Sequence, residues 1–201
     1  MSFLWLHTGA ILAGGRSSRM GAPKEGLRLP NGRAMVEHVL ATMLAFCRQV
    51  VILGESRGFA VPRDKRIIHL LDKRPGLGPL AGLESLLSSG LDTEYVVAAC
   101  DQPLITVPLL KKLVADDPAR PHFFRSAQSS LIYPLPGYFP AEMLAGVQTA
   151  LDSDDRSLFR LIKQSDAIFV PVSPEDESLL RSVNTPEDLK EIEQQMGFGR
   201  V

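Results

Sequence analysis

The sequence predicts a three-layer α/β sandwich, in which helices cover both faces of a parallel sheet. Segments of strand length and of helix length alternate over the first half of the 201 residues, which is the pattern of such folds. The strand candidates, among them residues 49–53 and 67–71, are continuously apolar, as expected of strands buried on both faces. The chain has no internal repeat or low-complexity linker, so its length suits one domain covering residues 1–201.

Each expected element is justified by apolar spacing and by the residues at its ends. Met35, Val39 and Met43 recur at helical spacing. Pro79 occupies the favoured first position of a helix, and Thr106 is suited to cap another. Strands are expected before residue 12 and over 26–29, 49–53, 67–71, 95–99, 122–125, 130–135 and 167–172, and helices over 34–47, from 79 to at least 87, and over 106–116, 140–151 and 158–162.

Three further expectations concern single positions. Thr185 is followed by proline and by two acids, the pattern of an N-cap with proline at the first helical position, so a C-terminal helix is expected to begin there. Pro171 interrupts the last strand and places its end at a sheet edge. His69 lies inside an apolar strand and is expected to be a satisfied core residue.

Composition and charge exclude several classes of protein. The formal net charge is -1, with both signs interspersed, so there is no footprint for nucleic acid or for an anionic membrane. No apolar run reaches the roughly 18 residues that a membrane helix requires. The apolar N-terminus lacks the basic start of a signal peptide, so a cytoplasmic protein is expected. Cys47 and Cys100 lack metal-ligand spacing and are expected to be buried free thiols.

Residues 12–24, LAGGRSSRMGAPK, have the composition of a phosphate-binding loop. Gly14 and Gly15 allow the backbone to approach a ligand closely. Arg16, Arg19 and Lys24 add three cations, whose mutual repulsion a polyanion would relieve. The spacing fits neither the dinucleotide fingerprint nor the P-loop. On composition alone, a basic strand-to-helix turn is therefore equally open.

Two aspartates follow expected strands. Asp101 comes just after residues 95–99, and in open α/β sheets ligands bind outside the carboxyl ends of the strands. It is a candidate ligand for Mg²⁺, which proteins commonly hold by one or two carboxylates plus substrate phosphates. An ordinary turn before proline is the alternative. Asp72 follows residues 67–71, and both a nucleotide contact and an ion pair with a neighbouring base are open for it.

Residues 12–24 match the pattern L-A-G-G-x-S-x-R-M-G-x-x-K at every specified position, and here the chain resembles the molybdenum cofactor guanylyltransferases. The resemblance extends to the GPLAG, CDQP and VNTPEDL segments, and so spans nearly the whole chain. It implies a Rossmann-like nucleotidyltransferase fold, an α/β/α sandwich with a mostly parallel sheet. It also implies an Mg²⁺-dependent transfer of GMP from GTP to the phosphate of molybdopterin, with release of pyrophosphate.

By the same resemblance, Asp101 is the Mg²⁺ ligand and lies at the nucleotide site. The other nucleotide-site positions that the resemblance implies are Leu12, Ala13, Gly14, Lys24 and Asp72. The residues agree with this chemistry, because an ionised phosphate acceptor needs no general base. Arg19 and Lys24 would offset the charge of the departing pyrophosphate, while Mg²⁺ on Asp101 would stabilise the α-phosphoryl oxygens. The predicted catalytic residues are therefore Arg19, Lys24 and Asp101.

The choice of substrates rests on fewer residues. Related cytidylyltransferases tend to read L-A-A-G, so Gly15 is expected to leave room for guanine. The family motif N-x-N has Ser182 and Asn184 in its two places here, which makes these the candidates for pterin contact. CTP, another phosphorylated acceptor such as a sugar phosphate, and a non-catalytic nucleotide-binding module remain the alternatives. Transient contacts with cofactor-synthesis proteins or acceptor molybdoenzymes are expected, and contacts with nucleic acid or membrane are not.

Overall fold

One sheet runs through the part of the chain that the structure describes. A computed structural model covers the chain and describes residues 7–13, 26–55, 58–114 and 117–197. The strands lie in the order β3-β2-β1-β4-β6-β5-β7. All pair in parallel except β6, which is antiparallel to both β4 and β5. The strands are β1 (Thr8–Leu12), β2 (Gln49–Leu53), β3 (Ile67–Leu70), β4 (Glu94–Ala99), β5 (His122–Ser126), β6 (Ile132–Pro140) and β7 (Ile168–Val172).

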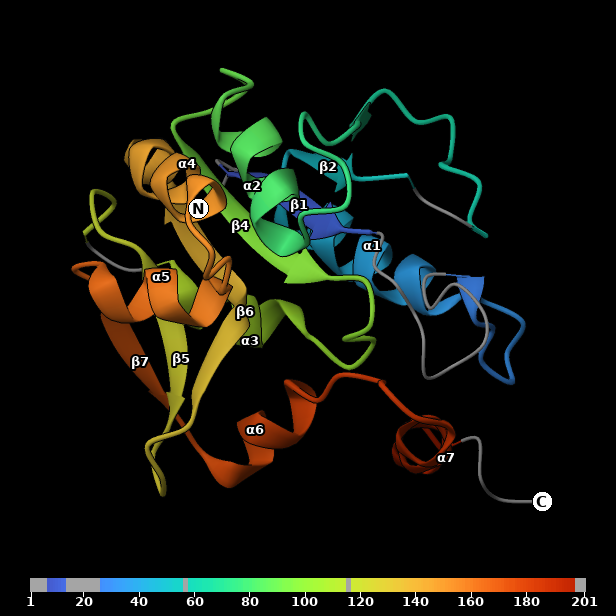
Figure 1. The fold of residues 1–201 in the computed structure, drawn as a ribbon. Coiled ribbons are helices and arrows are strands. Elements are labelled where there is room, and N and C mark those ends of the chain that lie inside the picture. Colours follow the sequence, from blue (N-terminus) through green and yellow to red (C-terminus); the bar gives the residue numbers. More distant parts are fainter. Residues whose placement is uncertain (1–6, 14–25, 56–57, 115–116, 198–201) are drawn as a thin grey trace, which may run out of the picture.

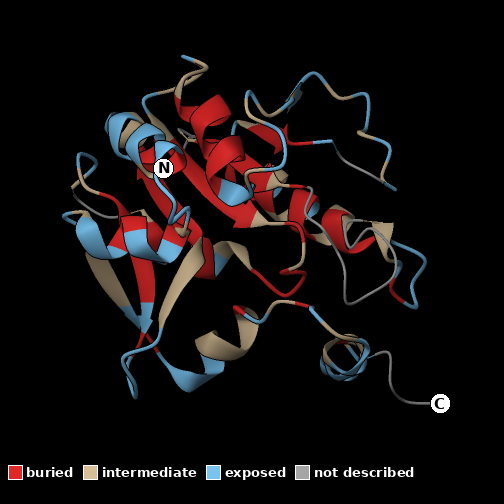
Figure 2. Ribbon diagram, in the orientation of Figure 1, coloured by how far each residue is buried: buried red, intermediate tan, exposed pale blue. Residues whose placement is uncertain are grey.

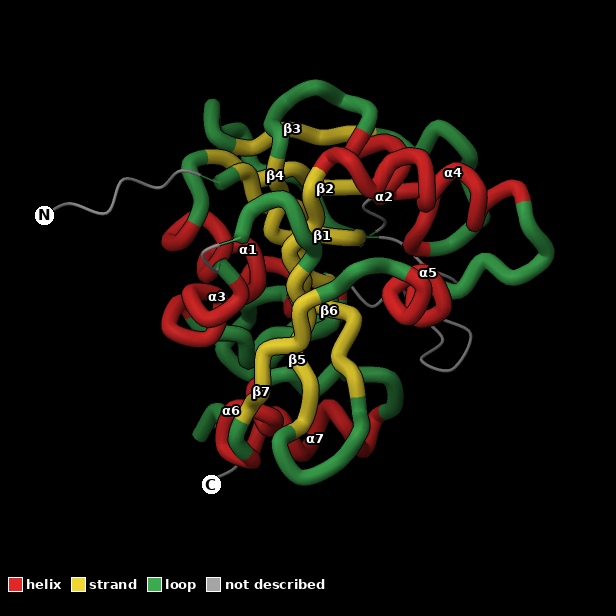
Figure 3. The backbone as a smooth tube through the Cα atoms, turned by 90° about the vertical axis from the view of Figure 1, so that its left-hand side faces the viewer, coloured by secondary structure: helices red, strands yellow, loops and turns green. Residues whose placement is uncertain are grey.

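Helices cover both faces of this sheet, so the predicted three-layer α/β/α sandwich with a mostly parallel sheet is confirmed (Figures 1 and 3). Helices α1 and α3 lie on one face, and α2, α4 and α5 on the other. The helices are α1 (Met35–Phe46), α2 (Pro79–Leu87), α3 (Val107–Leu113), α4 (Leu144–Asp152), α5 (Leu158–Gln164), α6 (Pro174–Leu179) and α7 (Pro186–Gln195). None of these described helices has the length and apolar character needed to cross a membrane.

Burial follows the layers, as Figure 2 shows. Strand β2 is buried at four of its five positions, which confirms the reading of a continuous apolar run as a doubly covered strand. Helix α2 is buried at eight of nine positions because it lies between the sheet and α4. Cys47 and Cys100 are buried free thiols, as expected.

The expectation for β3 was wrong in one respect. The strand forms, but it lies at the edge of the sheet and is only partly buried. His69 is therefore exposed rather than a core residue, and its Nε2 lies 2.7 Å from the carbonyl oxygen of Gly54. An apolar run predicts a strand, but the run does not reveal which strand of a sheet has no neighbour on its outer side.

The helix starts follow the capping signals. Thr106 accepts a hydrogen bond from the amide of Leu109 at the start of α3. Thr185 and Asp188 form a complete capping box at α7. Ser173 caps α6 by accepting a hydrogen bond from the amide of Asp176, with Pro174 at the first helical position. Helix α6 was not expected from the sequence, although its Ser-Pro-Glu-Asp start repeats the signal that predicted α7.

Several boundaries differ from expectation because pairing overrides local residue preference. Strand β6 was expected over 130–135 but continues to Pro140, since its second half pairs with β4 from Glu94 to Val97. Helix α4 consequently starts later than expected, after a 3₁₀ turn, η2 (Ala141–Met143). The strand expected over 26–29 is reduced to one isolated bridge between Arg28 and Ala34, and α3 ends at Leu113 instead of near 116.

Gly54, which follows β2, packs closely against the backbone of Ala13. Its φ is +92°, and a Cβ built on it would lie 2.1 Å from the carbonyl oxygen of Ala13. Both the left-handed φ and the contact exclude a side chain there. The end of β2 can therefore lie directly against the segment that leaves β1.

We predict that Gly54→Ala lowers the free energy of unfolding by more than about 2 kcal/mol, because the backbone clash adds to the roughly 1–2 kcal/mol of a left-handed alanine. Gly32→Ala is the matched control, since Gly32 has a φ of +80° but no atom within 4 Å of the added Cβ. It should cost only about 1 kcal/mol. Urea unfolding of both variants measures the difference, and equal losses would contradict the backbone contact.

Candidate active site

The order of the strands defines a crevice at one edge of the sheet. Strand β1 lies between β2 and β4, so the chain winds to one side through β2 and β3 and returns to the other side at β4. Ligands of open α/β sheets bind outside the carboxyl ends of the strands at such a reversal. Leu12 is level with Leu53 on one side and with Ala99 on the other. The loops after these three strands therefore leave the sheet side by side.

Leu12 and Ala13 lie at the centre of this edge. The amide of Ala13 donates to the carbonyl oxygen of Leu53 at 2.9 Å, and the amide of Cys100 donates to that of Leu12 at 3.2 Å. These bonds continue the sheet by one residue on either side of β1. The other predicted residues of the loop, namely Gly14, Gly15, Arg19 and Lys24, lie outside the residues that the structure describes.

Asp72 lies at the same edge, beside two glycines. Its Oδ1 is 3.9 Å from the point where a Cβ of Gly54 would lie and 3.6 Å from that of Gly82. Burial, and then the charge of Glu55, raise the pKa of the Asp72 carboxyl. A half-buried carboxylate at this edge can accept hydrogen bonds from a ligand that binds there.

The sequence left open an ion pair between Asp72 and a neighbouring base, and the structure rules this out. The ammonium group of Lys73 donates to Ser88 Oγ at 2.6 Å. The guanidinium of Arg74 lies 3.0 Å from a carboxylate oxygen of Glu84 and also pairs with Asp152. Within the described part of the chain, the Asp72 carboxylate has no hydrogen-bond or ion-pair partner.

The bases beside Asp72 fasten its loop to the helices behind it. The amide of Lys73 donates to the buried Ser85 Oγ at 2.8 Å, and Arg74 bridges α2 and α4 through Glu84 and Asp152. Glu84 is buried, so its pairing with a guanidinium offsets the cost of removing its charge from water. The loop that carries Asp72 is thus held in place from the side opposite to the crevice.

Asp101 is the polar residue that follows β4, the middle strand of the sheet. It is half-buried, and its carbonyl oxygen accepts a hydrogen bond of 2.9 Å from the amide of Val183. Among the described residues there is no group of three or more His, Cys, Asp or Glu side chains that could hold a metal ion by themselves. A single hard carboxylate at this edge suits Mg²⁺ only when substrate phosphates supply further oxygens.

The bond from Val183 also brings the predicted pterin-side residues to this edge. Ser182 and Asn184 flank Val183, and the side-chain amide of Asn184 donates to the carbonyl oxygen of Ser182 at 3.4 Å. The backbone amide of Asn184 donates to Asp188 in the capping box of α7. The predicted residues at this edge are therefore Leu12, which ends β1, and Ala13, Asp72, Asp101, Ser182 and Asn184, which lie in loops.

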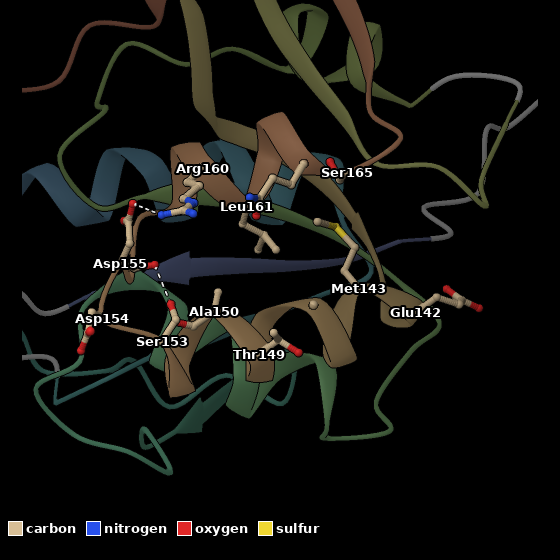
Figure 4. A pocket seen from close by; sticks show the side chains of 12 residues that line it. Glu142, Met143, Thr149, Ala150, Ser153, Asp154, Asp155, Arg160, Leu161 and Ser165 are labelled. Atoms are coloured by element: carbon tan, nitrogen blue, oxygen red, sulfur yellow. Dashed lines mark hydrogen bonds and ion pairs between the residues drawn. The ribbon is translucent and has the colours of Figure 1, made fainter.

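A cavity of about 610 Å³ lies elsewhere, between α4 and α5 (Figure 4). Its wall includes Met143, Leu161 and Arg160, and Arg160 forms an ion pair with Asp155. None of the residues that line it belongs to a loop after a parallel strand. The cavity is therefore separate from the edge that carries the aspartates.

The family of the chain follows from its similarity to known proteins. The model of the MobA-like NTP transferase domain matches residues 9–168. The chain belongs to this family. A probable molybdenum cofactor guanylyltransferase of Rhodopirellula baltica is 31% identical over 192 residues, which cover 90% of this chain and 89% of the relative. A molybdenum cofactor guanylyltransferase of Xanthomonas euvesicatoria is 40% identical over 110 residues, about half of each chain (54% and 53%).

Solved structures agree with the MobA-like fold. The molybdopterin-guanine dinucleotide biosynthesis protein A of Archaeoglobus fulgidus superposes with a TM-score of 0.74 at 24% identity, covering 94% of this chain and 98% of that one. A manganese complex of a Mycobacterium tuberculosis protein superposes with a TM-score of 0.67 at 18% identity, covering 93% and 97% of the two chains. The family match and the named relatives show that the MobA-like chain is a nucleotidyltransferase.

The site of this MobA-like chain also contains residues that the sequence did not single out. Arg74 and Ser85 hold the Asp72 loop, and Gln102 holds the Asp101 loop. Arg74 and Gln102 have partners more than 30 positions away along the chain, and the partner of Ser85 is a backbone amide. No local motif could have revealed these contacts.

We predict that Asp72→Asn stabilises this MobA-like chain at pH 7 while weakening GTP binding about 10-fold, the cost of one hydrogen bond to a charged group. The raised pKa of Asp72 means that its ionised form destabilises the folded state at neutral pH. The stability gain should shrink as the pH falls through that raised pKa, where the wild-type carboxyl becomes neutral. Thermal unfolding between about pH 3 and 7, a range that includes the ordinary carboxyl pKa near 4, and calorimetric GTP titration measure both effects.

Asp92→Asn is the matched control, and its folding stability is expected to change in the opposite direction. Burial raises the pKa of Asp92, but hydrogen bonds from Thr8 and Arg48 outweigh it and lower the pKa overall. That variant should lose stability at pH 7 and bind GTP as the wild type does. An Asp72→Asn variant that is less stable than the wild type, or that binds GTP equally well, would contradict the role given to this carboxylate.

Proposed function

We propose that the chain transfers GMP from GTP to the phosphate of molybdopterin, forming molybdopterin guanine dinucleotide and releasing pyrophosphate. The observation that carries the proposal is the meeting of Ala13, Asp72 and Asp101 at the carboxyl edge of β1, β3 and β4. The names of the Rhodopirellula and Xanthomonas relatives support guanine as the base and molybdopterin as the acceptor. The cytoplasmic location expected from the sequence is part of the same proposal.

The proposed reaction is a displacement at the α-phosphorus of GTP. An oxygen of the acceptor phosphate forms a bond to this phosphorus, the bond to the bridging oxygen breaks, and pyrophosphate leaves with the electron pair. The acceptor phosphate is largely ionised at neutral pH, so no side chain must remove a proton. The main obstacle is the approach of two anions. In this proposal Arg19 and Lys24 offset the charge that develops on pyrophosphate.

In this proposal Asp101 is the residue that holds Mg²⁺. Its position fits, because it provides one carboxylate at the edge where the phosphates of GTP would supply the remaining oxygens. Bound there, Mg²⁺ would neutralise charge on the α-phosphate. The backbone of residues 12–15 contacts the nucleotide, with Gly15 leaving room for guanine. In the same proposal Asp72 accepts hydrogen bonds from GTP, and Ser182 and Asn184 face the pterin.

The same assays distinguish the proposed reaction from three alternatives. These are CTP as the donor, a sugar phosphate as the acceptor, and a module that binds nucleotide without reacting. We predict that pyrophosphate is released from GTP only when Mg²⁺ and molybdopterin are both present, and that CTP turns over more slowly.

Lys24→Ala should reduce turnover about 100-fold or more, the typical effect of removing one preorganised partner of transition-state charge. Lys111→Ala, which removes an exposed lysine on α3, is the control and should react as the wild type does.

Coupled pyrophosphate detection and the mass of the product measure these outcomes. Preference for CTP would overturn the choice of guanine, and turnover of a sugar phosphate in place of molybdopterin would overturn the acceptor. GTP binding without pyrophosphate release would favour the non-catalytic module. Near-normal turnover by Lys24→Ala would remove Lys24 from the mechanism. Transient contacts with acceptor molybdoenzymes are a further part of the proposal, since the product must be handed on.

A further inference from the structure

Gln102 follows Asp101 directly and is a buried polar side chain, with 3% of its surface exposed. Its Oε1 accepts from the amide of Ala99 at 3.3 Å. Its Nε2 donates to the carbonyl oxygens of Leu135 at 2.8 Å and of Leu180 at 3.0 Å. Because both partners of the nitrogen are carbonyls, only one orientation of the amide is possible. The side chain therefore uses both donors and one acceptor at defined partners.

These three bonds join segments that are far apart in the sequence. Ala99 ends β4, Leu135 lies in β6, and Leu180 caps the end of α6. Leu135 lies on the carboxyl side of the β4 pairing, because Gly137 is already level with Val97. The amide of Gln102 thus occupies the junction between the middle strand, its antiparallel neighbour and the segment that leads into 182–184.

A second hydrogen bond joins the loop after β4 to the segment after α6. The amide of Val183 donates to the carbonyl oxygen of Asp101 at 2.9 Å. Val183 also packs with Leu104, Leu29 and Ile192 in a small apolar cluster between α7 and the loop after β4. Asp101 is therefore fastened to the segment of Ser182 and Asn184 by its own backbone and by the side chain of the next residue.

We infer that Gln102 is a positioning residue, which fixes the acceptor side of the site relative to Asp101. This rests on the proposed function, in which Asp101 acts at the nucleotide phosphates and residues 182–184 face the acceptor. The printed contacts of Ala13 and Asp72 lie along β1 to β3 and do not involve Gln102, while Leu12 meets the loop after β4 through the amide of Cys100. We therefore expect the loss of Gln102 to change the position of the acceptor more than the affinity for GTP.

An apolar residue of similar volume could not replace this side chain. Leucine would fill the space but would remove the donor that Leu135 and Leu180 share, leaving their carbonyl oxygens without it in a buried place. Glutamate keeps the shape and places an oxygen against two carbonyl oxygens, which repel it. Both changes are expected to separate the Asp101 loop from the 180–184 segment.

The test compares Gln102→Leu and Gln102→Glu with Tyr95→Phe. Tyr95 is fully buried at the opposite end of β4, where its hydroxyl donates to the carbonyl oxygen of Asp92 at 2.7 Å and accepts from the amide of Asp92 at 2.9 Å. The control therefore removes buried hydrogen bonds from the same strand without touching the carboxyl edge. The readouts are KM for GTP and for molybdopterin, kcat, GTP affinity by calorimetry, and hydrogen exchange of the Val183 amide.

We expect the Gln102 variants to raise KM for molybdopterin and lower kcat, with a combined loss of about 10- to 100-fold in kcat/KM, as for small misplacements of a reacting group. GTP affinity should change less than about threefold, a free-energy difference of under 1 kcal/mol. The Val183 amide should exchange faster. Tyr95→Phe should lower the thermal midpoint but leave both KM values and the Val183 exchange unchanged.

Two results would overturn the inference. One is wild-type kinetics and wild-type Val183 exchange in the Gln102 variants, and the other is an equal loss of GTP affinity and acceptor affinity, which would indicate general destabilisation. If Gln102→Leu does not fold, Gln102→Asn takes its place, because it keeps the amide but shortens its reach. A wild-type chain that releases no pyrophosphate refutes the proposed function itself, which is a separate outcome from inactive variants of an active enzyme.

Discussion

Parallel pairing of β1 with both β2 and β4 is the constraint on which the site depends. The register places Leu12 level with Leu53 and Ala99, so three successive loops begin at the same height above the sheet. Strand β3 continues this arrangement through its pairing with β2, and the amide of Gly54 donates to the carbonyl oxygen of Leu70 at 3.0 Å. Residues from four distant parts of the sequence thereby meet, because backbone pairing brings the ends of their strands together. A change in one register would separate them.

The same edge combines close backbone packing with a carboxylate that has no hydrogen-bond or ion-pair partner among the described residues. Gly54 has no room for a side chain, since an added Cβ would lie 2.1 Å from the carbonyl oxygen of Ala13, and a Cβ on Gly82 would displace the end of the Leu12 side chain, which lies 2.7 Å away. Asp72 lies beside them, and its raised pKa indicates that the folded state tolerates an unfavourable carboxylate there. The bases next to it in the sequence bind Ser88, Glu84 and Asp152 instead. Such an arrangement is typical of a binding site, where groups are held ready for a ligand at some cost to stability.

The sequence predicted the layers of the fold better than it predicted where the individual helices and strands begin and end. Continuous apolar runs, proline at the first helical position and hydroxyl caps are local signals, and β2, α2 and α7 begin where these signals place them. The full length of β6 depends on pairing with β4, and the edge position of β3 depends on the absence of an outer neighbour among the described strands, so neither is written in the local sequence. Helix α6 begins with a capping signal that is readable in the local sequence. Asp101 is a candidate in the sequence because it follows a strand, whereas the contacts of Gln102 with Leu135 and Leu180 cannot be read from the CDQP segment that contains it.

The most direct measurement is a crystal structure of the chain with Mg²⁺ and a GTP analogue that has a methylene group between the α- and β-phosphorus atoms. If the carboxyl edge is the active site, the triphosphate will lie against the backbone after β1, and Asp101 will hold the metal at about 2.1 Å. The base will lie near Asp72, Gly54 and Gly82. Nucleotide bound in the cavity between α4 and α5, or a metal bound away from Asp101, would contradict this assignment of the site.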